Sequence, residues 1–141
     1  FLQSRRGVVA DFAIAHMLPR LVGFERAFEL LVRAPRLSGK EAVSWGLAGR
    51  SVPAQEVLNV ALEIARDISA HCAPLPVGLH KHLLWRGLTM SLPEVAELET
   101  RALIHTMSTA DAIEGGLAFV ERRMPRWTAS VNKDWPLWLV D

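Results

Sequence analysis

The amino-acid sequence predicts a mainly α-helical protein with one short strand. Apolar residues recur at intervals of three and four along most of the chain, which is the spacing of one face of an α-helix. A serine is followed three residues later by a glutamate at Ser38 and Glu41 and at Ser91 and Glu94, a pair typical of helix starts. Only residues 47–52 are short and apolar enough for a strand, and the glycine and arginine within them favour a weak or edge strand.

Each helix is predicted from its apolar spacing and its end signals. Residues 108–111 repeat the capping pattern with an aspartate, and Pro74 and Pro76 are expected to break the chain before a new helix. The first expected helix ends at residues 18–23, and the next run through 26–31, from Ser38 to Gly46 and through 57–68. A further helix runs from about Val77 to Gly87, another starts at Ser91, and the last follows residue 109 and ends near Pro125.

Composition favours one soluble domain and excludes several classes of partner. With 141 residues, half of them apolar, the chain is long enough to bury a core. Its 16 basic and 15 acidic residues nearly balance, so no field favours nucleic acid or an anionic membrane. No apolar run approaches the ~18 residues of a membrane span. We therefore expect a cytoplasmic protein without nucleic-acid or membrane partners.

Cysteine and histidine usage argues against a metal site. The single cysteine, Cys72, excludes an intrachain disulfide and a multi-cysteine site, and it is expected to be buried. His80 and His82 lie two residues apart, so on a helix their imidazoles point ~200° apart and do not converge on an ion. We expect no metal.

The tail at residues 128–141 stands apart from the region at 1–127. Bulky apolar side chains gather after the last long helix, and something should cover them. Docking onto the same chain and insertion against a neighbouring subunit are both open. The apolar residues of the tail are Trp135, Leu137, Trp138, Leu139 and Val140.

Four ordered motifs carry a resemblance to a known family. They are Gly7-Val8-Val9-Ala10-Asp11, Leu18-Pro19-Arg20-Leu21-Val22-Gly23, the segment from Ser38-Gly39-Lys40-Glu41-Ala42 to Gly46-Leu47, and Ser108 to Arg123, which reads STADAIEGGLAFVERR. Together they resemble the crotonase superfamily of enoyl-CoA hydratases and isomerases. The resemblance implies the C-terminal helical and trimerisation region of a crotonase-like (ClpP/crotonase) fold, and hence a homo-oligomer, a trimer or a hexamer.

The resemblance also implies an acyl-CoA substrate, with coenzyme A as its carrier and no separate cofactor. Family chemistry stabilises a thioester enolate with two backbone N–H groups, and these donors lie on segments before Phe1. The chain starts at Phe1 and not at Met, so its beginning looks like a cut or a disordered boundary. One acid/base position of the family falls on Gln3, which cannot exchange a proton.

Asp11 is the remaining carboxylate near the site that the resemblance implies. In some branches of the family an aspartate here takes part in chemistry at the acyl chain, which makes Asp11 the candidate catalytic residue. General acid/base work needs a carboxylate within reach of the substrate. The alternative is structural, because an aspartate at a helix start also serves as an N-cap or first-turn residue.

Phe119 and Arg122 are the candidate residues for binding coenzyme A. Arg122 matches a family lysine that approaches the adenosine phosphate, often from an adjacent subunit, and Phe119 matches an aromatic residue near the adenine. Arginine keeps the charge and adds bidentate phosphate recognition. Arg122, Arg123 and Arg126 also crowd a helix end, where cations complement the helix dipole without any ligand.

Two hypotheses of function follow. The chain is part of an acyl-CoA hydratase or isomerase that is inactive without the segments carrying the oxyanion donors. Alternatively, it is a non-catalytic helical oligomerisation module derived from such an enzyme.

Overall fold

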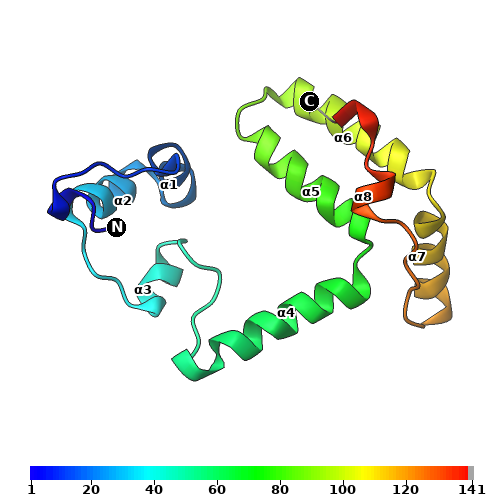
Figure 1. Ribbon diagram of the computed structural model, residues 1–141, viewed down its shortest axis with the longest axis horizontal. Helices are drawn as coiled ribbons and strands as arrows, with labels where there is room; N and C mark the ends of the chain where they lie inside the picture. The colour runs from blue at the N-terminus through cyan, green and yellow to red at the C-terminus, as the bar shows by residue number, and fades with distance from the viewer. Residues whose placement is uncertain (140–141) are drawn as a thin grey trace. The chain divides into compact units, whose positions relative to one another are not determined.

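The computed structural model describes residues 1–139, and these form two compact units (Figure 1). The first unit comprises residues 1–58, and the described part of the second comprises residues 59–139.

The first unit is built around two short helices joined by a tight turn. Its elements are the 3₁₀ turn η1 (Ser4–Arg6), α1 (Ile14–Val22), α2 (Phe24–Phe28), the π-helical turn η2 (Glu29–Arg33), α3 (Gly39–Ser44) and the 3₁₀ turn η3 (Ala54–Glu56). α2 continues directly into η2. The helices bury a small core of Leu18, Val22, Ala27 and Leu30.

Helix α3 begins with the predicted capping box. The Oγ atom of Ser38 accepts a hydrogen bond from the backbone N–H of Glu41 at 3.2 Å, and the Glu41 carboxylate accepts one from the backbone N–H of Ser38 at 2.7 Å. At its other end, Gly46 takes the left-handed conformation with φ +80°. There the N–H of Leu47 bonds to the carbonyl of Ala42 at 2.9 Å, as in a Schellman motif.

The strand expected at residues 47–52 is absent from the part of the chain that the structure describes. The backbone N–H groups of Leu47 and Ala48 both donate to the Ala42 carbonyl. Leu47 also packs against the core of the first unit. The apolar start of the segment therefore serves the end of α3, so the prediction of a strand was wrong.

The second unit holds the longer helices. After α4 (Val57–His71), which begins two residues before the boundary between the units, come α5 (Pro74–Gly87), α6 (Leu92–Met107), α7 (Ala110–Glu121), α8 (Val131–Asp134) and the 3₁₀ turn η4 (Leu137–Leu139). α5 begins at Pro74, earlier than expected. The first turn of a helix makes no use of its own backbone N–H groups, so a proline is tolerated there. α5 and α6 lie side by side (Figure 1).

The tail packs on its own chain. Leu139 is buried with Leu75 and Leu79 of α5, and Trp135 and Trp138 pack against this cluster. A Cβ atom at Gly78 would lie 3.2 Å from the Trp135 ring, so this glycine lets the tail approach α5 closely. Of the two interpretations of the tail, docking onto the same chain is the one that the structure shows; Val140 lies outside the described residues.

Polar contacts add to this packing. The guanidinium of Arg101 lies 4.3 Å from the centre of the Trp138 ring, and Nε2 of His105 is 3.1 Å from the carbonyl oxygen of Asp134. The His82 ring meets Trp135 edge-on with centroids 5.6 Å apart. His82 therefore has a packing role against the tail.

Many large apolar side chains stay exposed. The apolar face of α4 is exposed along its length, and so is Cys72, which was predicted to be buried. No helix among the described residues is long and apolar enough to cross a membrane.

Candidate functional site

The end of α7 gathers the candidate residues of the second unit. The helix ends at Glu121, earlier than the predicted end near Pro125, because Arg122 turns the chain into the left-handed conformation with φ +53°. The N–H of Arg122 bonds to the Phe119 carbonyl at 3.3 Å and that of Arg123 to the Ala118 carbonyl at 3.0 Å. This is the Schellman pattern seen at Gly46, with arginine at the position that usually holds glycine.

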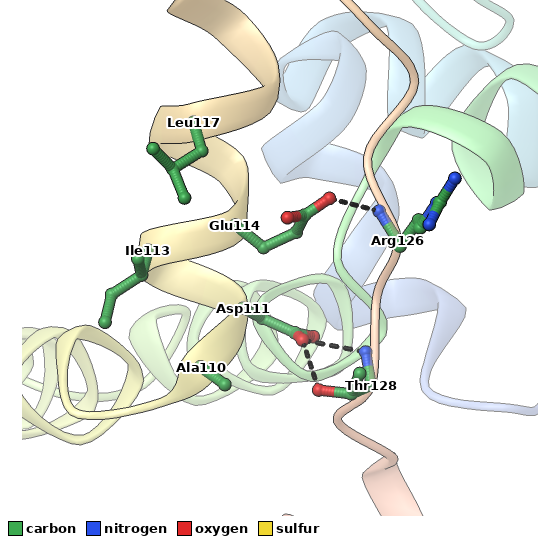
Figure 2. A pocket seen from close by; sticks show the side chains of 7 residues that line it. All are labelled: Ala110, Asp111, Ile113, Glu114, Leu117, Arg126 and Thr128. Carbon is green, nitrogen blue, oxygen red and sulfur yellow. Dashed lines mark hydrogen bonds between the residues drawn. The ribbon is translucent and has the colours of Figure 1, made fainter. Parts of the chain in front are cut away.

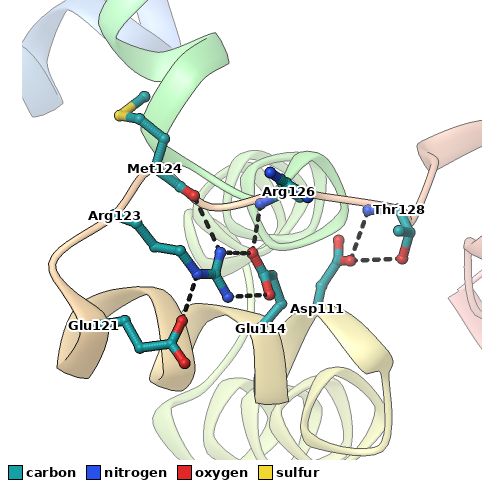
Figure 3. Close-up of polar contacts among 7 residues, drawn as sticks. All are labelled: Asp111, Glu114, Glu121, Arg123, Met124, Arg126 and Thr128. Carbon is teal, nitrogen blue, oxygen red and sulfur yellow. Dashed lines mark hydrogen bonds and ion pairs between the residues drawn. The ribbon is translucent and has the colours of Figure 1, made fainter.

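Glu114 fixes the path of the chain where it reverses direction after α7. The Glu114 carboxylate accepts hydrogen bonds from Arg123 at 2.5 and 2.9 Å and from the backbone N–H of Arg126 at 2.7 Å (Figure 3). Arg123 also donates to Glu121 at 2.5 Å. These bonds, the Arg123 bond first, lower the pKa of Glu114 to about 2, and the hydrogen bonds from Arg123 to Glu114 and Glu121 raise the pKa of Arg123.

A second carboxylate, that of Asp111, holds the returning chain one turn earlier on α7. Asp111 is only 4% exposed. It accepts hydrogen bonds from the N–H and hydroxyl of Thr128, at 2.7 and 2.9 Å, and from the N–H of Ala129 at 3.1 Å. The prediction that residues 108–111 cap α7 through their side chains was wrong, because the N-cap residue Thr109 makes no side-chain cap bond.

A small pocket of about 280 Å³ lies between α7 and the returning chain (Figure 2). Its polar lining consists of Asp111, Glu114, Arg126 and Thr128, and its apolar lining of Ala110, Ile113 and Leu117. Both carboxylates already bond to the chain itself. The polar groups of the pocket therefore stabilise the fold and have little hydrogen-bonding capacity left for a ligand.

Phe119 and Arg122 stand free at this same helix end. Phe119 is 86% exposed, and Arg122 is exposed as well. Among the described residues, the Arg122 guanidinium has no hydrogen-bond or ion-pair partner, whereas that of Arg123 is held by Glu114 and Glu121. Of the cations at the end of α7, Arg123 is thus paired, whereas the guanidinium groups of Arg122 and Arg126 form no hydrogen bond or ion pair among the described residues; Arg126 is held only through its backbone N–H.

Asp11 belongs to the first unit. It is exposed, and its backbone carbonyl accepts from the N–H of Ile14 at 3.2 Å. The N-cap of α1 is Ala13, without a side-chain cap bond, so Asp11 does not cap this helix. Phe12 and Ala13 both have positive φ, +53° and +55°, so a strained turn follows Asp11 directly.

Gln3 also lies in the first unit. Its side-chain oxygen is enclosed and has no hydrogen-bond partner among the described residues. The structure thus brings Phe119 and Arg122 together on one element and leaves Asp11 and Gln3 on the other unit.

A larger groove runs between α5 and α6. Its volume is about 780 Å³, and its lining is mostly apolar with a few polar groups. The lining residues are Pro76, Leu79, His80, Leu83, Leu84, Gly87, Leu88, Val95, Ala96, Glu99, Thr100, Ala102, Leu103 and Thr106. Sequence reasoning did not identify it, because it depends on how two helices pair.

Sequence reasoning also missed the roles of Asp111 and Glu114. The available signal was a pair of carboxylates three residues apart on a helix, followed by a cluster of arginines. Nothing in the sequence shows where the chain goes after α7, so the partners of these carboxylates were not predictable.

Known proteins resemble both the sequence and the structure. Residues 2–130 match the family model described as enoyl-CoA hydratase/isomerase. A probable enoyl-CoA hydratase/isomerase from Mycobacterium abscessus superposes with a TM-score of 0.88 at 43% identity, over 91% of this chain and 51% of that one. An enoyl-CoA hydratase from Mycobacterium tuberculosis H37Rv gives 0.84 at 29% identity, over 91% and 50%.

Curated relatives agree. An enoyl-CoA hydratase of Alternaria alternata is 36% identical over 131 residues, or 92% of this chain and 44% of the relative. A carnitinyl-CoA dehydratase of Proteus mirabilis is 32% identical over 129 residues, or 89% and 49%. The chain thus spans about half the length of the relatives that it matches.

The fold defined by these neighbours is helical and crotonase-like. The chain belongs to the enoyl-CoA hydratase/isomerase family, as its sequence motifs predicted.

Proposed function

We propose that this chain is the C-terminal helical part of an acyl-CoA hydratase or isomerase, with Phe119 and Arg122 contacting the nucleotide end of coenzyme A. The names of its relatives, enoyl-CoA hydratase and carnitinyl-CoA dehydratase, support an acyl-CoA thioester as substrate. We place this enzyme in the cytoplasm.

One observation carries the proposed contact. Arg122 takes a backbone conformation that costs a non-glycine residue about 1–2 kcal/mol, and its guanidinium has no partner among the described residues. The conformation itself closes the Schellman turn that ends α7, so the proposed contact rests on the exposed guanidinium without a partner. A guanidinium three residues after an exposed aromatic side chain, at the same helix end, suits a phosphate joined to a purine.

Calorimetric titration of the purified chain with coenzyme A tests this contact. Arg122→Gly keeps the left-handed turn and removes the charge, so the affinity should fall about 10- to 100-fold, the loss expected for a charge-assisted hydrogen bond. Phe119→Ala should lower it about tenfold through lost stacking. Arg66→Ala, at an exposed arginine of α4, is the matched control and should change it less than twofold. Equal affinities in all four proteins would refute the proposed contact.

Catalysis in the complete enzyme is proposed to involve Asp11 as an acid/base group. The resemblance implies that the two oxyanion donors of the family chemistry belong to a part of the relatives that these 141 residues do not match, so a sample of these residues alone should not hydrate crotonyl-CoA. Absorbance of the enoyl thioester would follow the reaction. Turnover by a homogeneous sample would contradict this proposal.

A second candidate function is favoured by the apolar surface that the chain leaves uncovered. Leu84 and Leu103, at the groove between α5 and α6, are both exposed. This surface suits a helical oligomerisation module that assembles as a trimer or hexamer. Sedimentation equilibrium should show association that Leu84→Glu and Leu103→Glu weaken, with Glu63→Ala as control. A monomer at every concentration would exclude this candidate.

A further inference from the structure

Two histidines from neighbouring helices contact the tail. The ring of His82, on α5, meets the Trp135 ring edge-on with centroids 5.6 Å apart. Nε2 of His105, on α6, lies 3.1 Å from the Asp134 carbonyl oxygen. The family match ends at residue 130, so both tail residues belong to a segment outside that match. Because histidine ordinarily gains its proton between about pH 8 and 5, the docked tail has two titratable contacts.

The two histidines respond differently to a proton. A carbonyl oxygen can only accept a hydrogen bond, so Nε2 of His105 donates to Asp134, and it can do so in the neutral and in the charged ring. Nε2 of His82 is enclosed and has no hydrogen-bond partner among the described residues. A neutral imidazole can leave that nitrogen without a proton, whereas the charged ring carries an N–H group on both nitrogens. Protonation of His82 therefore creates an enclosed donor without an acceptor, which is costly.

No carboxylate in the described part of the chain bonds to Nε2 of His82 to compensate such a charge. Asp134 and Glu94 accept hydrogen bonds from other backbone N–H groups, and Glu99 lines the groove between α5 and α6. The charged and titratable groups of α5, α6 and the tail around His82 are His80, Lys81, Arg86, Glu94, Glu97, Glu99, Arg101, His105, Lys133 and Asp134.

We infer that the tail is a pH-sensitive latch: protonation of His82 loosens Trp135 from α5, whereas His105 keeps its bond to the tail. Because the undocked tail leaves His82 freer to take a proton, docking is complete above about pH 7 and weakens as the pH falls toward about 5. Release of the tail uncovers Leu75 and Leu79, which pack against Leu139 in the docked state. This device is separate from the proposed coenzyme A contact and does not depend on it.

Amide hydrogen exchange of the tail tests the latch. Mass spectrometry of peptides from residues 131–139, on the complete 141-residue chain, should show protection that falls about tenfold between pH 7 and pH 5 after correction for the intrinsic exchange rate. His82→Phe keeps an aromatic ring against Trp135 and cannot be protonated, so its tail should stay protected at both pH values. His80→Phe, at an exposed histidine of the same helix, is the matched control and should respond like the wild type.

Two further variants distinguish the two histidines and guard against a misfolded protein. His105→Gln keeps an N–H donor for the Asp134 carbonyl and removes the titration, so its tail should still lose protection at pH 5. His82→Gln is a second uncharged variant, for use if circular dichroism shows that His82→Phe does not fold. The pH window also lies above that of Glu114, whose stabilisation is lost as the pH falls below about 5.

Three results would overturn the inference. The first is equal protection of the wild-type tail at pH 7 and pH 5. The second is a pH response that persists in His82→Phe or His82→Gln. The third is a response that disappears only in His105→Gln, which would assign the switch to that histidine.

Discussion

Asp111 and Glu114 are the residues through which α7 binds the segment of chain that follows it. Their carboxylates accept six hydrogen bonds between them. Glu114 accepts two from the Arg123 guanidinium and one from the N–H of Arg126, and Asp111 accepts two from Thr128 and one from the N–H of Ala129. Neither role is catalytic in this arrangement. Both carboxylates instead determine where the chain runs after the helix.

Asp111→Ala should destabilise the second unit. The substitution leaves the N–H groups of Thr128 and Ala129 without their acceptor, and hydrogen bonds to a charged group are worth about 1.5–3 kcal/mol each. We expect the free energy of unfolding, measured with urea, to fall by about 2–4 kcal/mol. Asp67→Ala, at an exposed aspartate of α4, should change it by less than about 0.5 kcal/mol. Equal effects of the two substitutions would contradict this role for Asp111.

Glu114 should make the stability depend on pH. Its pKa in the folded chain is lowered to about 2, first by Arg123, so its ionised form stabilises the fold above the unfolded pKa of about 4.5. That stabilisation should be lost as the pH falls from about 5 to 2. Urea unfolding at pH 6, 4 and 3 would measure it, and Glu114→Gln should flatten the profile in this window. An unchanged slope in Glu114→Gln would refute the assignment.

At the scale of the elements, the sequence predicted most helices because their end signals are local. The box at Ser38 and Glu41 forms as expected, and Glu94 accepts from the N–H of Ser91 at 2.7 Å. The failures have tertiary causes. The supposed strand at residues 47–52 starts by completing a helix end, and α7 stops early at a left-handed arginine that no propensity scale predicts.

The tail offers a matched pair of leucines in one short element. Leu139 is 6% exposed within the cluster of Leu75 and Leu79, whereas Leu137 is 87% exposed. Leu139→Ala should lower the free energy of unfolding by about 2 kcal/mol, at the lower end for buried leucines because it lies near the chain end. Leu137→Ala should have almost no effect. If the two variants unfold alike, the tail does not dock as described.

At the scale of the whole chain, each unit has its own buried cluster. Leu30 is buried in the first unit and Leu79 in the second. Leu30→Ala should therefore speed amide hydrogen exchange in α1 and α2 and leave α5 and α6 unchanged, while Leu79→Ala should do the reverse. Mass spectrometry of peptides from each unit would show it. A uniform increase across both units would mean that they unfold together.

The family was predictable from the whole sequence. Which arginine side chains at the end of α7 are unpaired was not predictable. The motifs from Leu18 to Arg123 identified the family because they are helix ends and packing positions in a fixed order. The sequence could not tell that Glu114 pairs with the guanidinium of Arg123 but only with the backbone N–H of Arg126, since that depends on where Glu114 lies after the chain reverses. The catalytic assignment of Asp11 stays a prediction.

The hydrogen bonds that Glu114 accepts also affect how fast a protease can cleave the chain. Arg122, Arg123 and Arg126 put three tryptic cleavage sites within five residues, on an exposed surface segment where nicking is usually fast. A protease must draw several residues into extended form before it cuts, and the bonds from Arg123 and from the Arg126 backbone to Glu114 oppose this. By opposing this extension, the Glu114 carboxylate should slow the cleavage that would separate α7 from the tail.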